Sequence, residues 1–371
     1  MRRGRAILFT SLPRVGGHST ITLGLAPILR QSFGEVEIWC KPMPDHGHSE
    51  SSQAALEALG CRVVLLADPD GRLNPAALAR AVAGTIANPP DLFIALAMRN
   101  LAPVLAQATR ARRSIYYHIT HDLHDATVAF LRRCLRAFHK LAFICPATYE
   151  DFPREGIDPA RLTWVPQLSE IPVENPEELI ASRASDRGPL RIGLIGRLTE
   201  QKGARVMLDF ARTFSDRGEL HLAGSGPFED DFRQLALTDR PLAVTFHGRY
   251  DPADRARFLR NFFAGLDWLV VPSQDEWETL SMAVLEALQH GVPALVCQTG
   301  GLRSFRHTDL GPPADDIIRL IPADAVASSL EMIFSKNEMC TSEKARRCRE
   351  HYERFFSNDR VAGRWSALFN G

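Results

Sequence analysis

Residues 190–203 read LRIGLIGRLTEQKG, and they contain the two features on which the fold prediction depends. The first is an apolar run over residues 190–196, which has the length and composition of a buried strand. The second is a loop that carries Arg197 and Lys202 and leads into a helix expected to begin near Ala204. A strand that runs directly into a helix is the first half of a βαβ unit, the building block of parallel sheets.

The same alternation of short apolar runs and helix-length segments extends in both directions from this stretch. It predicts an α/β chain with two doubly wound, Rossmann-like parallel sheets. In the first half the expected strands are residues 6–12, 36–40, 62–67, 92–98, 114–120, 141–145 and 162–165. In the second half they are 190–196, 220–223, 244–247, 268–272, 294–297 and 317–321. Helices are expected between most strands, for example over 20–31 and 75–85, and over the charged tail at 342–369.

A polar stretch punctuated by prolines, residues 166–189, interrupts this alternation and predicts an interdomain linker. The 371 residues suffice for two domains at roughly 100–200 residues each. We expect one Rossmann-like domain over 1–180, a second over 187–340, and C-terminal helices over 341–371 that pack back toward the first. Open α/β sheets bind ligands beyond the carboxyl ends of their strands, so a ligand cleft between the two domains is expected.

Composition excludes several classes of protein. The 44 basic and 44 acidic residues balance, which argues against a general nucleic-acid binder. Only five of the basic residues are lysines, so each lysine merits inspection as a phosphate ligand. Seven cysteines without C-x-x-C spacing indicate reduced thiols and a cytoplasmic protein. The apolar run at 6–9 is too short for a signal peptide, and no run reaches the roughly 18 residues of a membrane span.

Two loops of the second half have residues suited to an anionic sugar compound. Arg197 and Lys202 precede a helix N-terminus, where free N–H groups also favour a diphosphate; the alternative is a solvated charged loop. Glu278 and Glu286 are separated by seven residues. If a helix starts near Leu280, Glu278 precedes its first turn and Glu286 follows about two turns on, on roughly the same face. Carboxylates accept paired hydrogen bonds from the vicinal hydroxyls of a ribose or hexose.

The alternative for the glutamates is two solvent-facing side chains, and the apolar neighbours of Glu286 count against it.

The turn at 224–227, GSGP, follows another expected strand. It does not complete a G-x-G-x-x-G motif, because Glu229 stands in place of the third glycine. This departure argues against a dinucleotide-dependent dehydrogenase.

In order and spacing, these motifs together resemble the GT-B retaining glycosyltransferases with an E-x7-E motif, the glycosyl transferases group 1 type. The motifs are GRLTEQKG at 196–203, GSGP at 224–227, VPS at 271–273, Glu278-x7-Glu286 and GVP at 291–293. The resemblance implies two Rossmann-like domains that face each other across a cleft, the first on the acceptor side and the second binding a nucleotide sugar. It also implies metal-independent transfer of a sugar from a nucleotide diphosphate sugar to a hydroxyl acceptor, with retention of anomeric configuration and no cofactor.

The resemblance also implies a role for each matching residue. Arg197 and Lys202 would hold the donor diphosphate, Glu278 the donor sugar and Glu286 the ribose. Gly226 and the backbone N–H groups of 279–282 would lie against the donor; these residues are Thr279, Leu280, Ser281 and Met282. The family usually reads E-G-F-G from the first glutamate, whereas this chain reads ETLS. The departure leaves the identity of the donor sugar open.

In the first half, the resemblance places Gly16 and Gly17, in a loop after the first strand, near the donor phosphates, and His121 near the donor sugar. The spacing of His118, His121 and His124 also raises a metal site, but strand alternation directs 118 and 121 to opposite faces, so no metal is expected. Asp68-Pro69-Asp70 has the D-x-D form of metal-dependent transferases, and its neighbouring Gly and Pro favour a simple turn.

Other readings of the sequence remain open. The segment 130–140 places Leu131, Leu135 and Phe138 on one helical face among basic residues. It is either a peripheral contact with the inner membrane surface or a domain helix with an exposed arginine face. The alternative functions are a sugar-nucleotide epimerase of the same fold and a catalytically weakened nucleotide-sugar-binding protein. The acceptor is open among glycans, lipid-linked sugars and small molecules.

Overall fold

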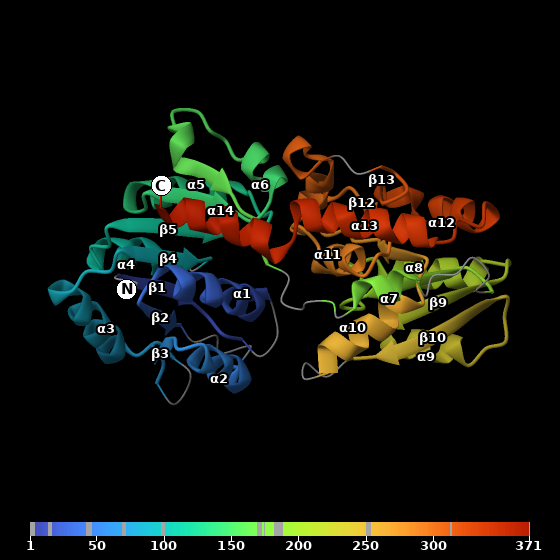
Figure 1. The fold of residues 1–371 in the computed structure, drawn as a ribbon, viewed down its shortest axis with the longest axis horizontal. Helices are drawn as coiled ribbons and strands as arrows, with labels where there is room; N and C mark the ends of the chain where they lie inside the picture. The colour runs from blue at the N-terminus through green and yellow to red at the C-terminus, as the bar shows by residue number, and fades with distance from the viewer. Residues whose placement is uncertain are drawn as a thin grey trace. The chain divides into compact units, whose positions relative to one another are not determined.

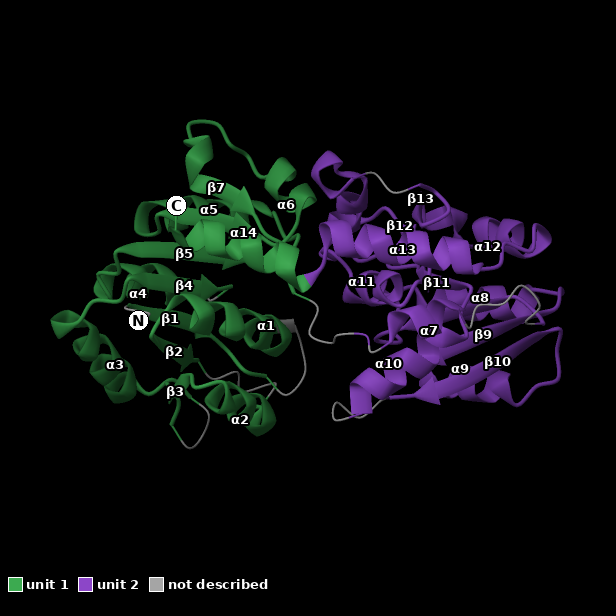
Figure 2. Ribbon diagram, in the orientation of Figure 1, with its two compact units in different colours: residues 1–170, 358–371 green, residues 171–357 purple. Residues whose placement is uncertain are grey.

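The computed structural model describes residues 4–13, 17–41, 47–68, 72–97, 101–168, 173, 175–181, 188–249, 254–311 and 314–370. The chain divides into two compact units, shown in different colours in Figure 2. Unit 1 comprises residues 1–170 and 358–371, and unit 2 comprises residues 171–357. Strands and helices alternate along both units, as the labels of Figure 1 show.

Unit 1 is built on a seven-stranded sheet in the order β3-β2-β1-β4-β5-β6-β7, and every neighbouring pair of strands is parallel. Its strands are β1 (Arg5–Thr10), β2 (Glu35–Cys40), β3 (Arg62–Leu65), β4 (Leu92–Leu96), β5 (Arg113–His118), β6 (Lys140–Phe143) and β7 (Leu162–Trp164). Its helices are α1 (Gly17–Ser32), α2 (Glu50–Ala58), α3 (Pro75–Ala87), α4 (Ala102–Ala108), α5 (Asp125–Ala137), α6 (Pro146–Asp151), the 3-10 helix η1 (Pro159–Arg161) and α14 (Asn358–Asn370).

Unit 2 is built on a six-stranded parallel sheet in the order β10-β9-β8-β11-β12-β13. Its strands are β8 (Arg191–Ile195), β9 (Gly218–Ala223), β10 (Leu242–Gly248), β11 (Trp268–Val271), β12 (Ala294–Cys297) and β13 (Ile318–Ile321). Its helices are α7 (Pro176–Ala181), α8 (Ala204–Thr213), α9 (Glu229–Ala236), α10 (Arg255–Ala264), α11 (Met282–Gln289), α12 (Val326–Ser335) and α13 (Ser342–Phe355). Short 3-10 helices are η3 (Gly300–Arg306), η4 (Thr308–Leu310) and η5 (Ala323–Ala325).

The predicted pair of doubly wound sheets is confirmed. In each sheet the first strand is internal and the strand order reverses beside it, which is the arrangement of a Rossmann-like fold. Every one of β1–β13 overlaps an expected strand. The prediction succeeds because strands covered on both faces read as continuous apolar runs. All residues of β1, β4 and β12, for example, are buried.

Two segments differ in detail from expectation. Helix α7 lies inside the stretch expected as a linker, and Pro176 occupies its first position, where a proline is compatible with a helix. Ile180 of α7 is buried against Cys340 and Ala345, so packing stabilises this short helix. Residues 182–187 of the same stretch lie outside the described residues.

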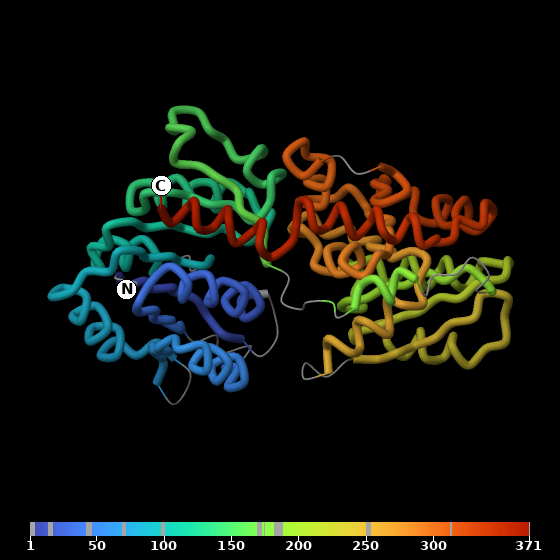
Figure 3. Tube along the Cα trace, viewed as in Figure 1, coloured from blue at the N-terminus to red at the C-terminus, as the bar shows by residue number. Residues whose placement is uncertain are grey.

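The tail is two helices rather than one. Helix α13 contacts α11 within unit 2, whereas α14 contacts α1 and belongs to unit 1. Figure 3 shows α14 as the red end of the trace. Within unit 1, the ring of Trp365 in α14 is buried and meets the ring of Tyr117 edge-on, with the ring centroids 4.9 Å apart. The segment predicted at 341–371 therefore divides between the two units.

A buried charge network links the first three strands of unit 1. The carboxylate of Glu37 is 1% exposed and accepts hydrogen bonds from Arg5 Nε at 2.7 Å and from Trp39 Nε1 at 2.9 Å. Arg5 donates to Oε1, whereas Trp39 donates to Oε2, and Arg62 Nη2 also lies 2.7 Å from Oε2. Burial alone would raise the pKa of Glu37, but the hydrogen bonds from Arg62, Trp39 and Arg5 lower it. Glu37 is therefore ionised at neutral pH.

Helix α5 uses its apolar face inside unit 1. Leu131, Leu135 and Phe138 all belong to the buried core, whereas Arg132, Arg133 and Arg136 are exposed. The exposed face of α5 therefore carries arginines, and its apolar face is buried in the core. This arrangement favours the interpretation as a domain helix. Across the described residues, none of the helices combines the length and hydropathy needed to span a bilayer.

Candidate functional site

Three loops meet at the carboxyl end of the unit 2 sheet, after β8, β9 and β11. The loop after β8 is tied to the loop after β9, because the N–H of Leu198 donates to the carbonyl of Ser225 at 2.9 Å. Gly203, the residue before α8, has φ +76°, and a Cβ there would lie 2.2 Å from the carbonyl oxygen of Pro272 after β11. Only glycine fits this close approach, which brings the Lys202 loop against the loop that carries Glu278.

The glycines of the turn at 224–227 likewise allow a close approach between loops. A Cβ on Gly226 would lie 2.4 Å from the carbonyl oxygen of Leu198, and one on Gly224 would lie 1.8 Å from that of Gly196. Backbone from the loop after β8 therefore requires glycine at both positions. The donor contact expected for Gly226 stays a prediction.

Lys202 is the centre of a charged cluster formed by these loops. Its Nζ forms ion pairs with Oε2 of Glu278 and with Oδ2 of Asp275, the latter at 3.4 Å. The hydroxyl of Ser273 donates to Glu278 Oε2 at 3.3 Å. Burial lowers the pKa of Lys202; the charge of Asp275 opposes this shift, and that of Arg197 adds to it. The cluster brings together Lys202 and Glu278, which the sequence predicts as site residues, and adds Asp275 and Ser273.

The surroundings of Arg197 differ from those of Lys202. It is exposed in the loop after β8, and its guanidinium makes no hydrogen bond or ion pair with any part of the chain that the structure describes. An uncompensated guanidinium beside a paired ammonium suits an incoming anion with more than one negative oxygen, because guanidinium groups bind phosphates through a planar fork of donors.

Glu278 lies in an ordered loop before α11. Its N–H donates to the carbonyl of Asp275 at 3.0 Å, and its carbonyl accepts from the N–H of Gly301 at 2.7 Å. The expectation that the helix starts near Leu280 is wrong by two residues, because α11 begins at Met282. Glu278 still precedes the first turn, as expected.

Residues 279–281 lead into α11. The Leu280 side chain is buried, so it anchors the loop to the core. Ser281 occupies the N-cap position, is buried and does not cap the helix with its side chain. Thr279 is half-buried, and Met282 is the first helical residue. The backbone N–H groups at the start of α11 are thus left without a side-chain cap, as a site for an oxygen-rich ligand requires.

Glu286 is buried in the second turn of α11, with 7% of its side chain exposed. Its Oε1 accepts a hydrogen bond from Nη2 of Arg255, the first residue of α10. The alternative of a solvent-facing glutamate is therefore excluded. Sequence reasoning did not find Arg255, because no local pattern connects it with a carboxylate 31 positions away.

The candidate residues of unit 1 are held by their own neighbours. Nδ1 of His121 lies 2.9 Å from Oγ1 of Thr148, and its Nε2 lies 3.3 Å from Oδ2 of Asp151. Nε2 of His118 lies 3.2 Å from the carbonyl oxygen of Asp122. Among the described residues, no group of three or more His, Cys, Asp or Glu side chains has the arrangement of a metal site.

Two predictions of unit 1 fall partly outside the described residues. Gly17 is the first residue of α1, but Gly16 is not described. Oδ1 of Asp68 accepts from the N–H of Arg72 at 2.7 Å, whereas Pro69 and Asp70 lie outside the described residues.

The second unit contains the part of the chain that matches a known family model. Residues 189–331 match the family model of the glycosyl transferases group 1. The glycogen synthase of Leptothrix cholodnii is 35% identical over 112 residues, which are 29% of this chain and 22% of that enzyme. The chain thus spans less than a quarter of the length of that synthase.

Solved structures resemble the whole chain. The complex of Anabaena Alr3699/HepE with UDP and glucose has a TM-score of 0.71 at 14% identity, covering 99% of this chain and 100% of that one. The catalytic domain of Arabidopsis thaliana starch synthase IV, bound to ADP and acarbose, has a TM-score of 0.67 at 14% identity, with coverage of 100% and 99%. These similarities confirm the predicted GT-B fold of two Rossmann-like domains.

Proposed function

We propose that this protein is a glycosyltransferase that moves a sugar from a nucleotide diphosphate sugar to a hydroxyl acceptor, with retention and without a metal. The observation that carries the proposal is the cluster of Lys202, Glu278 and Asp275 beside the open Arg197. It lies at the carboxyl edge of a Rossmann-like sheet, within the segment that matches the glycosyl transferases group 1.

Departure of the nucleoside diphosphate is the step that the cations assist. Negative charge grows on the diphosphate oxygen as the glycosidic bond breaks, and positioned cations stabilise that charge. In the proposed mechanism Arg197 and Lys202 supply this positive charge, so no metal ion is needed to neutralise the diphosphate. Lys202 is held close to Glu278, which places the diphosphate next to the sugar-binding carboxylate.

The two glutamates would hold the two sugars of the donor. Glu278 accepts hydrogen bonds from donor-sugar hydroxyls, together with the uncapped N–H groups at the start of α11. Glu286, oriented by Arg255, accepts from the ribose hydroxyls. His121 contacts the donor sugar in the family that the sequence resembles, and its ring is held in place here by Thr148 and Asp151.

Retention in this proposal proceeds by departure and attack on the same face of the sugar. A double displacement requires a carboxylate nucleophile at the anomeric carbon, whereas this proposal assigns Glu278 to the hydroxyls of the donor sugar. With no other carboxylate in this cluster assigned to the sugar, the leaving diphosphate itself would accept the acceptor proton.

A donor-by-acceptor screen with product mass detection tests the proposal. Purified protein is incubated with UDP- and ADP-linked hexoses in chelator, with glycan, lipid-linked and small hydroxyl acceptors. We expect transfer, or slow donor hydrolysis without an acceptor, and an NMR spectrum of the product with the donor's anomeric configuration. A free 2-epimer would indicate the epimerase instead, and binding without turnover would indicate a nucleotide-sugar-binding protein.

A further inference from the structure

Asp275 connects the Lys202 ammonium with the loop that carries Glu278. We propose that Asp275 is a positioning residue, which retains Lys202 when the Glu278 carboxylate turns from Lys202 to the donor sugar. This inference rests on the proposed function and adds to it a residue that the resemblance does not supply.

Backbone hydrogen bonds hold Asp275 in place. Its Oδ1 accepts from the N–H of Trp277 at 3.0 Å, and its carbonyl accepts from the N–H of Glu278 at 3.0 Å. Its own N–H donates to Oγ of Ser273 at 3.4 Å. The second carboxylate oxygen, Oδ2, is the one that faces Lys202 Nζ at 3.4 Å. One oxygen thus fixes the side chain while the other holds the ammonium.

The charge balance explains why a second carboxylate is useful. One ammonium faces two carboxylates here, and Glu278 Oε2 contacts both Lys202 and Ser273. Release of Lys202 frees this oxygen of Glu278 for the sugar hydroxyls. A partly buried ammonium without a partner is costly. Asp275 removes that cost, because it keeps a negative charge beside Lys202 after Glu278 has moved.

The test variant is Asp275→Asn, which preserves the acceptor for the Trp277 N–H but removes the charge. Lys202 then has Glu278 as its sole anionic partner in the cluster, so Glu278 is held more tightly. We expect turnover of the sugar nucleotide to fall about tenfold, the loss typical of one charged hydrogen bond. The Kd for UDP or ADP should not weaken, because a negative charge near the diphosphate has been removed.

The pH profile gives a second readout. The charged groups that act on Lys202 are the carboxylates of Asp275 and Glu278 and the guanidinium of Arg197. Asp275 opposes the lowering of the Lys202 pKa, so its removal should lower that pKa further. In Asp275→Asn the alkaline limb of activity should therefore move to lower pH, and Asp275→Glu should restore part of both turnover and profile.

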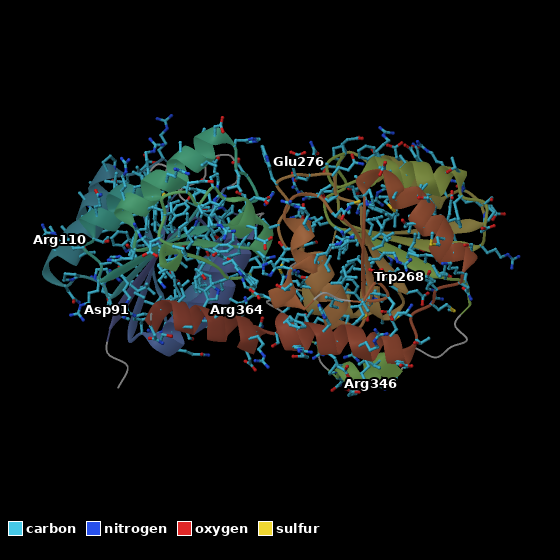
Figure 4. The ribbon with its side chains drawn as sticks, turned by 90° about the horizontal axis from the view of Figure 1, so that it is seen from above. Asp91, Arg110, Trp268, Glu276, Arg346 and Arg364 are labelled. Atoms are coloured by element: carbon cyan, nitrogen blue, oxygen red, sulfur yellow. The ribbon has the colours of Figure 1, made fainter. Side chains whose placement is uncertain are left out.

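Glu276→Gln is the matched control. Glu276, labelled in Figure 4, is the exposed neighbour on the same loop, and its substitution removes the same charge. It should retain wild-type turnover and pH profile. Unchanged turnover in Asp275→Asn, or a loss of UDP and ADP affinity in step with turnover, would overturn the role of Asp275. An inactive wild-type protein would instead overturn the proposed function and, with it, this inference.

Discussion

The guanidinium of Arg255, at the start of α10, forms an ion pair with the buried carboxylate of Glu286 in α11. In the proposed mechanism this pair orients the carboxylate toward the ribose. A buried ion pair keeps the carboxylate charged and fixes its orientation. Substitution of Arg255 should therefore weaken binding of the nucleotide and leave binding of the donor sugar unchanged.

Arg255→Gln should weaken binding of UDP or ADP about tenfold, the effect of about 1.4 kcal/mol in an interaction with a charged group. Calorimetric titration measures this Kd directly. Arg257→Gln, which removes an exposed arginine from the same helix, is the control and should bind as the wild type does. Equal affinity in both variants would contradict a role for Arg255 in nucleotide binding.

Lys202→Ala should reduce kcat by about 10²–10³ while the protein stays folded, because preorganised charge at a leaving group contributes on this scale. Lys202→Arg should restore little, since a guanidinium does not fit the geometry of an ammonium between two carboxylates. Steady-state kinetics and circular dichroism measure the two effects. The control is Lys336→Ala at the exposed C-terminus of α12. Wild-type kcat in Lys202→Ala would remove this lysine from the diphosphate site.

Glu278→Gln should alter the choice of donor sugar more than the affinity for the nucleoside diphosphate. The amide keeps one oxygen acceptor but loses the charge that pairs with Lys202 and the ability to accept two bonds at each oxygen. Comparison of kcat/KM across sugar nucleotides, beside the Kd for UDP or ADP, separates the two effects. An unchanged ranking of donors would exclude Glu278 from contact with the sugar.

Glu37 should make the stability of unit 1 depend on pH. Its hydrogen bonds lower the folded-state pKa despite burial, so its stabilisation is fully present above the unfolded-state pKa of about 4.3. The stabilisation is lost as pH falls through the lower folded-state pKa. Glu37→Gln should therefore reduce the unfolding free energy by about 1–3 kcal/mol at pH 7, and by less at pH 3. Urea denaturation at both pH values measures this. A difference independent of pH would indicate that Glu37 is not ionised in the folded protein.

The sequence predicts the sheets better than the details of the site. Buried parallel strands are recognisable because both faces are apolar, and this holds even for short strands such as β11 and β12. The spacing of the sequence motifs singles out Lys202 and Glu278 as candidate residues, but it does not predict their ion pair, which depends on the approach of Gly203 to Pro272. Asp275 and Arg255 were missed because tertiary packing alone gives them their partners.

Helix boundaries show the same limitation. The helix start expected near Leu280 is two residues early, because Leu280 and Ser281 are buried in extended or turning backbone before α11. Similarly, the prolines of 166–189 suggest a linker throughout, whereas Pro176 opens α7. Burial of Ile180 against α13 supplies the stabilisation that local sequence does not reveal.

The return of α14 to unit 1 has a consequence for biosynthesis. Residues 171–357 are inserted within unit 1, whose last helix is translated after the whole of unit 2. During synthesis the ring of Tyr117 therefore lacks its contact with Trp365 until residues 171–357 have been translated. Unit 2 can become compact while unit 1 still lacks a helix, so a chain truncated before α14 would keep every residue of its second unit and lack one helix of its first.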